Sequence, residues 1–213
     1  MGQAERIIGL AAALAIVYLI RFAARDEVSW ARTAVKTLSV ALLALAAAGS
    51  SAPAAIIAGL TLGAVGDFCL SRPGERAFLA GVAAFALGHL AYAAVFLWQS
   101  PLPVPHPWPA ALALVALGVS TEFWLAPHAG ALRGAVRLYV AVILVMALAA
   151  LTLPSERGLA VAGAGLFVLS DLLLALERFV IGDAGRRRLL ALLLWPAYWV
   201  GQALILLGFA GTG

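Results

Sequence analysis

Charge is scarce in this sequence. Asp, Glu, Lys and Arg together make up 11% of its 213 residues, whereas a soluble globular domain carries about 25%. Hydrophobic residues account for 64% of the chain. This composition excludes a water-soluble domain and predicts an integral membrane protein.

Cysteine is also scarce, and several signature motifs are absent. The single cysteine, Cys69, excludes an internal disulfide framework, and its apolar neighbours favour a packing role. The sequence contains no phosphate-binding loop, no nucleophile elbow and no dinucleotide-binding fingerprint. It therefore offers no motif for nucleotide binding or for a serine nucleophile.

Long apolar runs are abundant. A helix needs roughly 17 to 25 apolar residues to cross a bilayer, and charges, prolines and turn clusters divide the chain into eight runs of about that length. We predict an all-α, polytopic membrane protein in which residues 1–213 form a single integral membrane domain of eight transmembrane helices. The first helix is expected to be retained, because no small-residue cleavage site follows it. The expected spans are approximately Ile7–Phe22, Thr33–Ala48, Pro53–Leu70, Ala77–Trp98, Trp108–Ala126, Ala135–Leu151, Gly158–Leu176 and Leu189–Phe209.

Lysine and arginine are concentrated on one set of connections. Arg6 and Arg157 fall on one side of the expected membrane, and twelve basic residues fall on the other. The positive-inside rule then predicts a multi-pass protein of the cell (inner) membrane with both termini on the non-cytoplasmic side. The net charge of +4 needs no nucleic-acid partner, because these residues orient the chain and contact anionic lipid head groups. The twelve are Arg21, Arg25, Arg32, Lys36, Arg72, Arg76, Arg133, Arg137, Arg178, Arg186, Arg187 and Arg188.

Ionisable residues inside the expected spans are the most informative feature. An aspartate at the centre of a membrane helix costs about 2.5 to 3.5 kcal/mol, so such residues usually face a bundle interior or a water-filled cavity. With a rise of about 1.5 Å per residue, four of them from four spans are expected in one slab of the cytoplasmic half. They are Lys36, Asp67, Glu122 and Asp171.

Further polar side chains are expected to line the same interior. His89 lies near the middle of the fourth span, in a face that carries small, aromatic and polar residues at helical spacing. Tyr198 and Gln202 stand four residues apart and share one helix face. The candidate supporting and substrate-binding residues are Lys36, His89, Tyr92, Tyr139, Ser170, Tyr198 and Gln202.

Structural alternatives stay open for these residues. Lys36 could reach the lipid interface and only set orientation, and Ser170 could serve helix packing alone. A buried histidine or tyrosine often makes a structural hydrogen bond between helices. The ion pairs to consider are Glu122 with Arg133 or Arg137, and the aspartates with Arg72 and Arg178.

Four stretches resemble, in their order and spacing, the YhhN-type lysoplasmalogenase family of eight-helix membrane proteins. The stretches are "GDFCL", "FLAGVAAFALGHLAYA", "LFVLSDLLLALERF" and "YWVGQALILLG". The resemblance covers the third to eighth spans and extends to Lys36, although Thr37 follows this lysine where the family usually has proline. It places the family's polar positions at Asp67, His89, Tyr92, Ser170, Asp171, Tyr198 and Gln202.

The resemblance implies a reaction and a substrate. The expected activity is hydrolysis of the vinyl-ether bond of lysoplasmalogens, which are lysophospholipids with a 1-alkenyl chain. The products would be a fatty aldehyde and glycerophosphocholine or glycerophosphoethanolamine. No cofactor is expected, and the preferred head group and the oligomeric state are left open.

This chemistry suits two buried carboxyl groups. Acid opens a vinyl ether by protonating its β-carbon, after which water adds to the oxocarbenium ion and the hemiacetal collapses. The reaction needs a protonated acid and a carboxylate that stabilises the cation and activates water. Our hypothesis is that Asp67 and Asp171 form the catalytic pair and share one proton. Which of them is the acid stays open.

A metal site is the alternative to acid catalysis. A zinc hydrolase needs about three histidine or carboxylate ligands. Two of the three histidines, His106 and His128, fall in loops that the topology places on opposite sides of the membrane. A site made from Asp67, Asp171 and His89 stays conceivable, but no metal is expected.

Two other functions compete with hydrolysis of a lipid. An intramembrane aspartyl protease also has two buried aspartates, but its Gly-x-Gly-Asp and Pro-Ala-Leu signatures are absent here. A transporter of lipids or small solutes could use the acids as a proton relay. Such transporters often have repeats with broken helices. The only sign of a repeat here is the weak similarity between "GDFCL" and "SDLLL".

Overall fold

The protein folds as an all-helical bundle. The computed structural model describes residues 2–25, 27–101 and 107–210, and within these ranges it contains eight α-helices and no β-strand. Short 3₁₀ turns precede α6 and α7, and one π-helical turn, Leu176–Val180, follows α7. The α-helices are α1 (Gln3–Arg21), α2 (Trp30–Ala48), α3 (Ala54–Leu70), α4 (Glu75–Trp98), α5 (Trp108–Trp124), α6 (Arg133–Ala150), α7 (Gly158–Ala175) and α8 (Ala184–Ala210).

The predicted spans correspond to these helices one for one, but several helices begin earlier than expected. α2 begins at Trp30 rather than Thr33, and α8 begins at Ala184 rather than Leu189. Basic residues in the first turns had been assigned to loops, yet long basic side chains can reach water from a helix end. The start of α2 is fixed by Ser29, whose Oγ accepts a hydrogen bond of 3.2 Å from the Arg32 amide.

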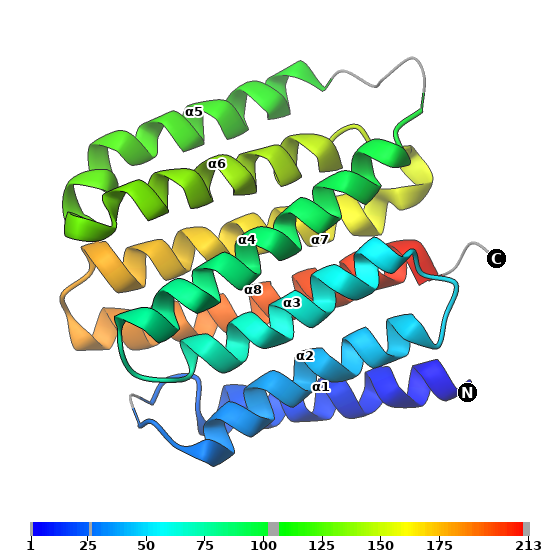
Figure 1. Ribbon diagram of the computed structural model, residues 1–213, viewed down its shortest axis with the longest axis horizontal. Helices are drawn as coiled ribbons and strands as arrows, with labels where there is room; N and C mark the ends of the chain where they lie inside the picture. Colours follow the sequence, from blue (N-terminus) through cyan, green and yellow to red (C-terminus); the bar gives the residue numbers. More distant parts are fainter. Residues whose placement is uncertain (1, 26, 102–106, 211–213) are drawn as a thin grey trace.

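The helices lie side by side along one common direction (Figure 1). Successive helices alternate in direction, so both described ends of the chain lie at the same end of the bundle. α3 packs against α4, and α7 packs against α8, while α5 lies at the edge next to α6. α3, α4, α7 and α8 therefore form the middle of the bundle, and α5 lies at its edge.

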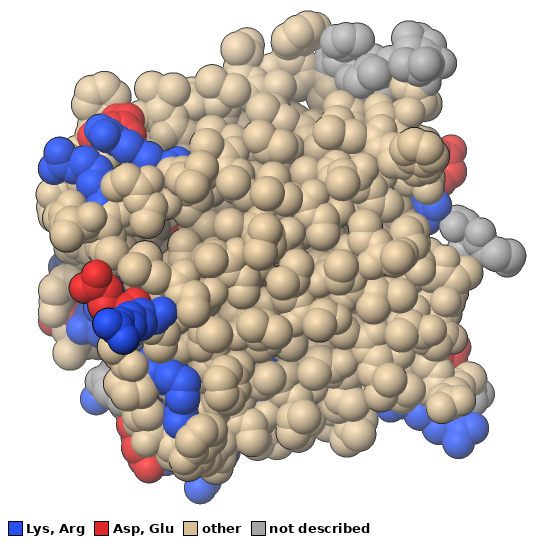
Figure 2. Space-filling view, in the orientation of Figure 1, with Lys and Arg blue, Asp and Glu red and all other residues tan. Residues whose placement is uncertain are grey.

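The outer surface fits a lipid environment. Among the described residues, seven helical segments are long and apolar enough to cross a membrane. The segment of α5 reaches this length together with the 3₁₀ turn that follows it, and the apolar α3 is slightly shorter at 17 residues. Large apolar side chains are exposed on the outer surface; Phe123 is 80% exposed and Ile20 is 72% exposed. Figure 2 shows a broad uncharged belt with the charged side chains at the two ends. The prediction of a polytopic helical membrane bundle is confirmed.

Missing side chains on α3 make room for polar side chains from other helices. A Cβ atom at Gly59 would overlap the ring of Tyr92 on α4, and one at Gly63 would lie 2.5 Å from Gln202 Nε2 on α8. Both contacts are too short for a real side chain. The glycines of α3 therefore allow α4 and α8 to place polar groups across its surface, and the candidate site forms there.

Candidate active site

The first cluster of the site pairs Lys36 with Asp67. Lys36 Nζ on α2 lies 3.0 Å from Asp67 Oδ1 on α3, and the Asp67 side chain is 1% exposed. The Tyr198 hydroxyl on α8 donates a 2.8 Å hydrogen bond to Asp67 Oδ2. The rings of Tyr18 and Trp195 lie 5.9 and 5.8 Å from the Lys36 ammonium group. Lys36 therefore points into the bundle, and the alternative in which it only reaches the lipid interface is wrong.

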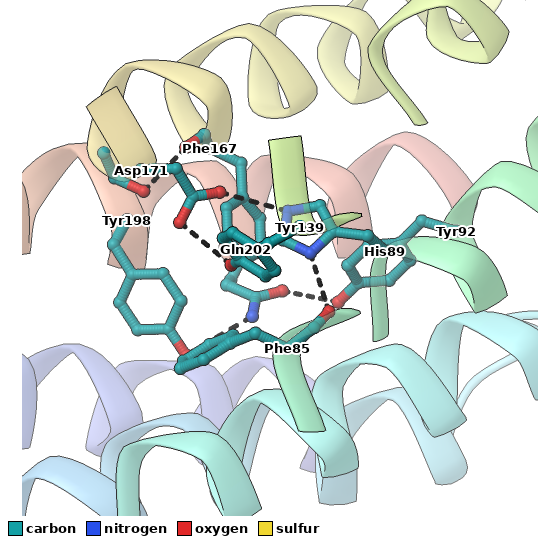
Figure 3. A network of polar contacts seen from close by, with 9 residues as sticks. Phe85, His89, Tyr92, Tyr139, Phe167, Asp171, Tyr198 and Gln202 are labelled. Carbon is teal, nitrogen blue, oxygen red and sulfur yellow. Dashed lines mark hydrogen bonds and ion pairs between the residues drawn. The ribbon is translucent and has the colours of Figure 1, made fainter. Parts of the chain in front are cut away.

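Gln202 extends this cluster toward α4. Its side-chain amide donates to the Tyr198 hydroxyl at 3.4 Å and accepts a short hydrogen bond from the Tyr92 hydroxyl. Figure 3 shows Gln202 between the two tyrosines. Both tyrosines and the glutamine are buried. A continuous line of polar contacts thus runs from Lys36 to Tyr92, as the shared helix face of Tyr198 and Gln202 predicts.

The second cluster of the site forms around Asp171. His89 Nε2 on α4 lies 3.2 Å from Asp171 Oδ2 on α7. The Tyr139 hydroxyl on α6 donates a 3.1 Å hydrogen bond to Asp171 Oδ1, and the three side chains converge in Figure 3. The ring of His89 also packs on Phe167, with ring centroids 4.4 Å apart. Three helices therefore hold one carboxyl group, and the Asp171 side chain is 9% exposed.

The two acids have separate partners. No hydrogen bond joins the carboxyl groups of Asp67 and Asp171 in the described part of the chain. Arg72, one of the suggested structural partners, instead donates to Thr33 Oγ1 and stacks on Trp30 at 4.1 Å. The other, Arg178, lies over the ring of Phe78 at 5.2 Å. The structure thus pairs the acids with a lysine and a histidine, and a proton shared directly between them stays a prediction.

Two of the predicted residues lie apart from both clusters. Glu122 forms an exposed ion pair with Arg137, with Nε–Oε1 and Nη2–Oε2 distances of 2.9 and 2.6 Å. This confirms the structural alternative for Glu122, so only three of the four expected ionisable residues belong to the interior. Ser170 bonds within its own helix, because its hydroxyl donates to the Phe167 carbonyl at 2.7 Å.

A basic pocket opens beside the first cluster. Its volume is about 450 Å³, and its walls carry four basic residues and two acidic ones: Arg32, Lys36, Arg72, Arg178, Glu75 and Glu177. Tyr18 and Trp195 line it as well. The pocket lies at the end of the bundle where Figure 2 shows most of the basic side chains. An anionic group is the ligand class that such a lining suits.

An apolar groove lies beside the second cluster. It has a volume of about 100 Å³ and runs between α4, α5, α6 and α7. Asp171 and Tyr139 are among the few polar residues in its walls. Four residues line both the groove and the basic pocket, so the two spaces adjoin. These residues are Phe78, Leu132, Leu174 and Arg178.

Sequence reasoning missed the aromatic walls of the site. Tyr18 stands alone among the aliphatic residues of α1. Its isolated hydroxyl group was the feature of the sequence that could have indicated a place in the site. Trp195 is buried, and its indole N–H donates to the Ala15 carbonyl at 2.9 Å. Phe167 carried no signal, because a phenylalanine in an apolar helix has many equivalent roles.

A bound metal ion would need several donor side chains in one place. Within the described ranges, no three His, Cys, Asp or Glu side chains lie close enough together to hold a metal ion. His128 lies on an exposed turn, with its Nδ1 2.9 Å from the Trp124 carbonyl. His106 lies outside the described residues.

A family model covers most of the chain. The model of the YhhN family matches residues 31–209. The chain belongs to the YhhN family. This match includes all the polar residues of both clusters and leaves the whole of α1 outside.

Two curated relatives are named Lysoplasmalogenase. They come from Mycobacterium bovis (strain ATCC BAA-935 / AF2122/97) and Mycobacterium tuberculosis (strain CDC 1551 / Oshkosh). Each is 31% identical over 160 residues, which are 72% of this chain and 59% of the relative. The match therefore spans about three fifths of the length of these relatives. No solved structure matches the chain significantly.

Proposed function

We propose that this protein is a membrane hydrolase of the lysoplasmalogenase type. Its substrate would be a 1-alkenyl lysophospholipid, and its products a fatty aldehyde and glycerophosphocholine or glycerophosphoethanolamine. The observation that carries the proposal is the position of Asp171, a mostly buried carboxyl group in the wall of an apolar groove that adjoins a basic pocket. The name of the two mycobacterial relatives supports the same reaction.

The two adjoining spaces match the two halves of a single-chain lipid. The basic pocket would hold the phosphate, because Arg32, Lys36 and Arg72 supply positive charge there. The groove between α5, α6 and α7 would hold the alkenyl chain, which gains from burial in an apolar lining. The vinyl-ether bond joins these two parts, so it would lie near the junction, within reach of Asp171.

The acids would then take different parts in the reaction. Asp171 would supply the proton to the β-carbon of the vinyl ether and, once ionised, stabilise the oxocarbenium ion. Asp67 would remain a carboxylate beside the Lys36 ammonium group and fix its position in the wall of the basic pocket. Tyr139 would orient the Asp171 carboxyl group through its hydrogen bond to Oδ1. No step in this scheme requires a cofactor.

Reconstitution tests this proposal. Purified protein in liposomes should release aldehyde from a 1-alkenyl lysophospholipid but not from the matching 1-alkyl ether, which lacks the double bond. Asp171→Asn should reduce kcat by at least about 100-fold, because a positioned acid contributes 10²–10⁴-fold. Glu122→Gln is the matched control, since it removes an exposed carboxylate outside both clusters. Aldehyde release that is unchanged in Asp171→Asn would contradict the assigned role.

A proton relay is the second candidate function. The line of contacts from Lys36 through Asp67, Tyr198 and Gln202 to Tyr92 favours it, because such chains of polar groups can conduct protons. A transporter should acidify or alkalinise sealed vesicles when its solute is added, without lipid breakdown. Tyr92→Phe, which interrupts this line without touching Asp171, should abolish such transport and leave aldehyde release intact.

A further inference from the structure

A backbone carbonyl fixes the tautomer of His89. The Nδ1 atom of His89 lies 2.7 Å from the carbonyl oxygen of Phe85, one turn earlier in α4. A carbonyl oxygen can only accept a hydrogen bond, so Nδ1 carries a hydrogen. In a neutral imidazole the other nitrogen, Nε2, then has a bare lone pair.

This second nitrogen faces the Asp171 carboxyl group. Nε2 and Asp171 Oδ2 are 3.2 Å apart, off the direction of an aligned hydrogen bond, and neither atom has another hydrogen-bond partner among the described residues. A bare lone pair against a carboxylate oxygen would repel at this distance, and little water is present to screen it. A single proton between the two atoms turns the contact into an attraction, as imidazolium with carboxylate or as imidazole with carboxylic acid.

We infer that His89 and Asp171 hold one proton between them and that this pair is the proton donor of the reaction. The inference rests on the proposed function of the same site and deepens it. Asp171 lines the groove and would touch the substrate. His89 is fully buried behind Asp171 and is a positioning residue that keeps the proton in place.

The neighbouring groups distinguish this pair from the other acid. Asp171 is faced by Tyr139 from α6, which donates to Oδ1, and it shares the groove wall with Arg178. Asp67, in contrast, has a lysine as its partner and lines neither the groove nor the basic pocket. An ammonium group favours the ionised form of a carboxyl group, whereas a histidine with one fixed hydrogen favours a shared proton. The two aspartates thus have different kinds of partner, and only Asp171 has one that can share its proton in this way.

The catalytic step balances with water as the only co-reactant. The pair transfers its proton to the β-carbon, so a C–H bond forms as the C=C π bond breaks, and an oxocarbenium ion remains beside the carboxylate. Water adds to the cationic carbon, and its released proton returns to the pair. The hemiacetal then loses the glycerol oxygen as an alcohol and becomes the aldehyde. One water molecule is consumed, and the pair ends as it began.

Nitrogen NMR of labelled histidine tests the proton directly. The chain has three histidines, so the spectrum is simple, and His89→Gln identifies the signal of residue 89. In wild-type protein in nanodiscs at neutral pH, we expect Nε2 of His89 to be proton-bearing or to share a proton. In Asp171→Asn we expect a bare Nε2, whereas Glu122→Gln should match the wild type. An Nε2 that shows neither a bonded hydrogen nor a hydrogen bond from a carboxylic acid in the wild type, across the range in which free imidazole titrates, would overturn the inference.

Kinetics provide an independent readout. His89→Gln should lower kcat about 100-fold or more with little change in KM, and should alter the pH profile of kcat. A kcat and pH profile equal to those of the wild type would overturn the inference.

The two readouts separate the inference from the proposed function. If the wild type releases no aldehyde but Nε2 is proton-bearing, the proposed function fails and the pair stands. If aldehyde is released while Nε2 is bare, the proposed function stands and the pair fails. The wild-type spectrum distinguishes these outcomes even if a variant fails to fold.

Discussion

Each ionisable side chain inside the bundle has a partner that removes part of the cost of its burial. Lys36 offsets part of the cost of burying the Asp67 carboxyl group, and His89 does the same for Asp171. The sequence revealed three of these residues, because a charge within an apolar run is conspicuous, and His89 because it lies on a polar helix face. It could not reveal which residues pair with each other. Helical periodicity identifies the face of a residue, whereas pairing depends on how helices are arranged in three dimensions.

Removal of Lys36 should destabilise the protein strongly. Lys36→Met leaves the Asp67 carboxylate buried without its cation, and breaking a buried pair in this way costs about 3–5 kcal/mol. Adding Asp67→Asn removes the charge and should restore most of the lost stability. Thermal unfolding in detergent, followed by tryptophan fluorescence, measures both effects as shifts in Tm.

An exposed ion pair provides the comparison for Lys36. Arg137→Gln breaks the contact with Glu122 at the surface, and exposed pairs contribute little to stability. Its Tm should therefore stay close to that of the wild type. A Tm of Lys36→Met that equals the wild-type value would contradict the pairing of Lys36 with an ionised Asp67.

At the scale of the helix, small residues determine how closely neighbours approach. α7 and α8 touch through backbone: a Cβ atom at Gly163 would lie 2.6 Å from the Gly201 carbonyl oxygen, and one at Gly201 would lie 2.9 Å from the Gly163 carbonyl oxygen. Glycines permit close approach of membrane helices in general. Their partner helices could not be predicted, since small residues carry no signal for a specific neighbour. The π-helical turn after α7 was not predicted either, because no residue type in the sequence marks such a turn.

Two glycines of α7 give a matched test of this packing. A Cβ atom at Gly163 collides with the backbone of α8, whereas a Cβ atom at Gly165 meets no atom within 4 Å. Gly163→Ala should therefore lower Tm by forcing α7 and α8 apart, and it should also lower activity, because α7 carries Asp171 and α8 carries Tyr198. Gly165→Ala should leave Tm unchanged or slightly raised, because alanine favours the helix. Similar Tm values for the two variants would contradict the close contact.

For the molecule as a whole, the charges mark the two ends of the bundle. Most of the basic side chains gather at the end that carries the α1–α2, α3–α4, α5–α6 and α7–α8 connections, as the alternation along the sequence predicts (Figure 2). Composition and run length were sufficient to predict the class and the number of helices. The side of the membrane that each end faces stays a prediction from the positive-inside rule.

Cysteine labelling tests the orientation. In a background that carries Cys69→Ala, one added cysteine is placed at Ser155, between α6 and α7, or at Gly182, between α7 and α8. Both positions are exposed and lie at opposite ends of the bundle. A membrane-impermeant maleimide should label Ser155→Cys in intact cells and Gly182→Cys only after the cytoplasmic membrane is opened. The reverse pattern would show that the termini face the cytoplasm.

The hydrogen bond from Trp195 to the Ala15 carbonyl has a consequence for biogenesis. The bond joins positions 180 residues apart, and the Trp195 ring also packs on Tyr18, with centroids 4.3 Å apart. The first helix therefore meets this partner only after α8 has left the ribosome. Until then, α1 and α2 lie in the bilayer without the contact to α8. Nascent chains halted before α8 should for this reason be the ones that cellular quality control removes.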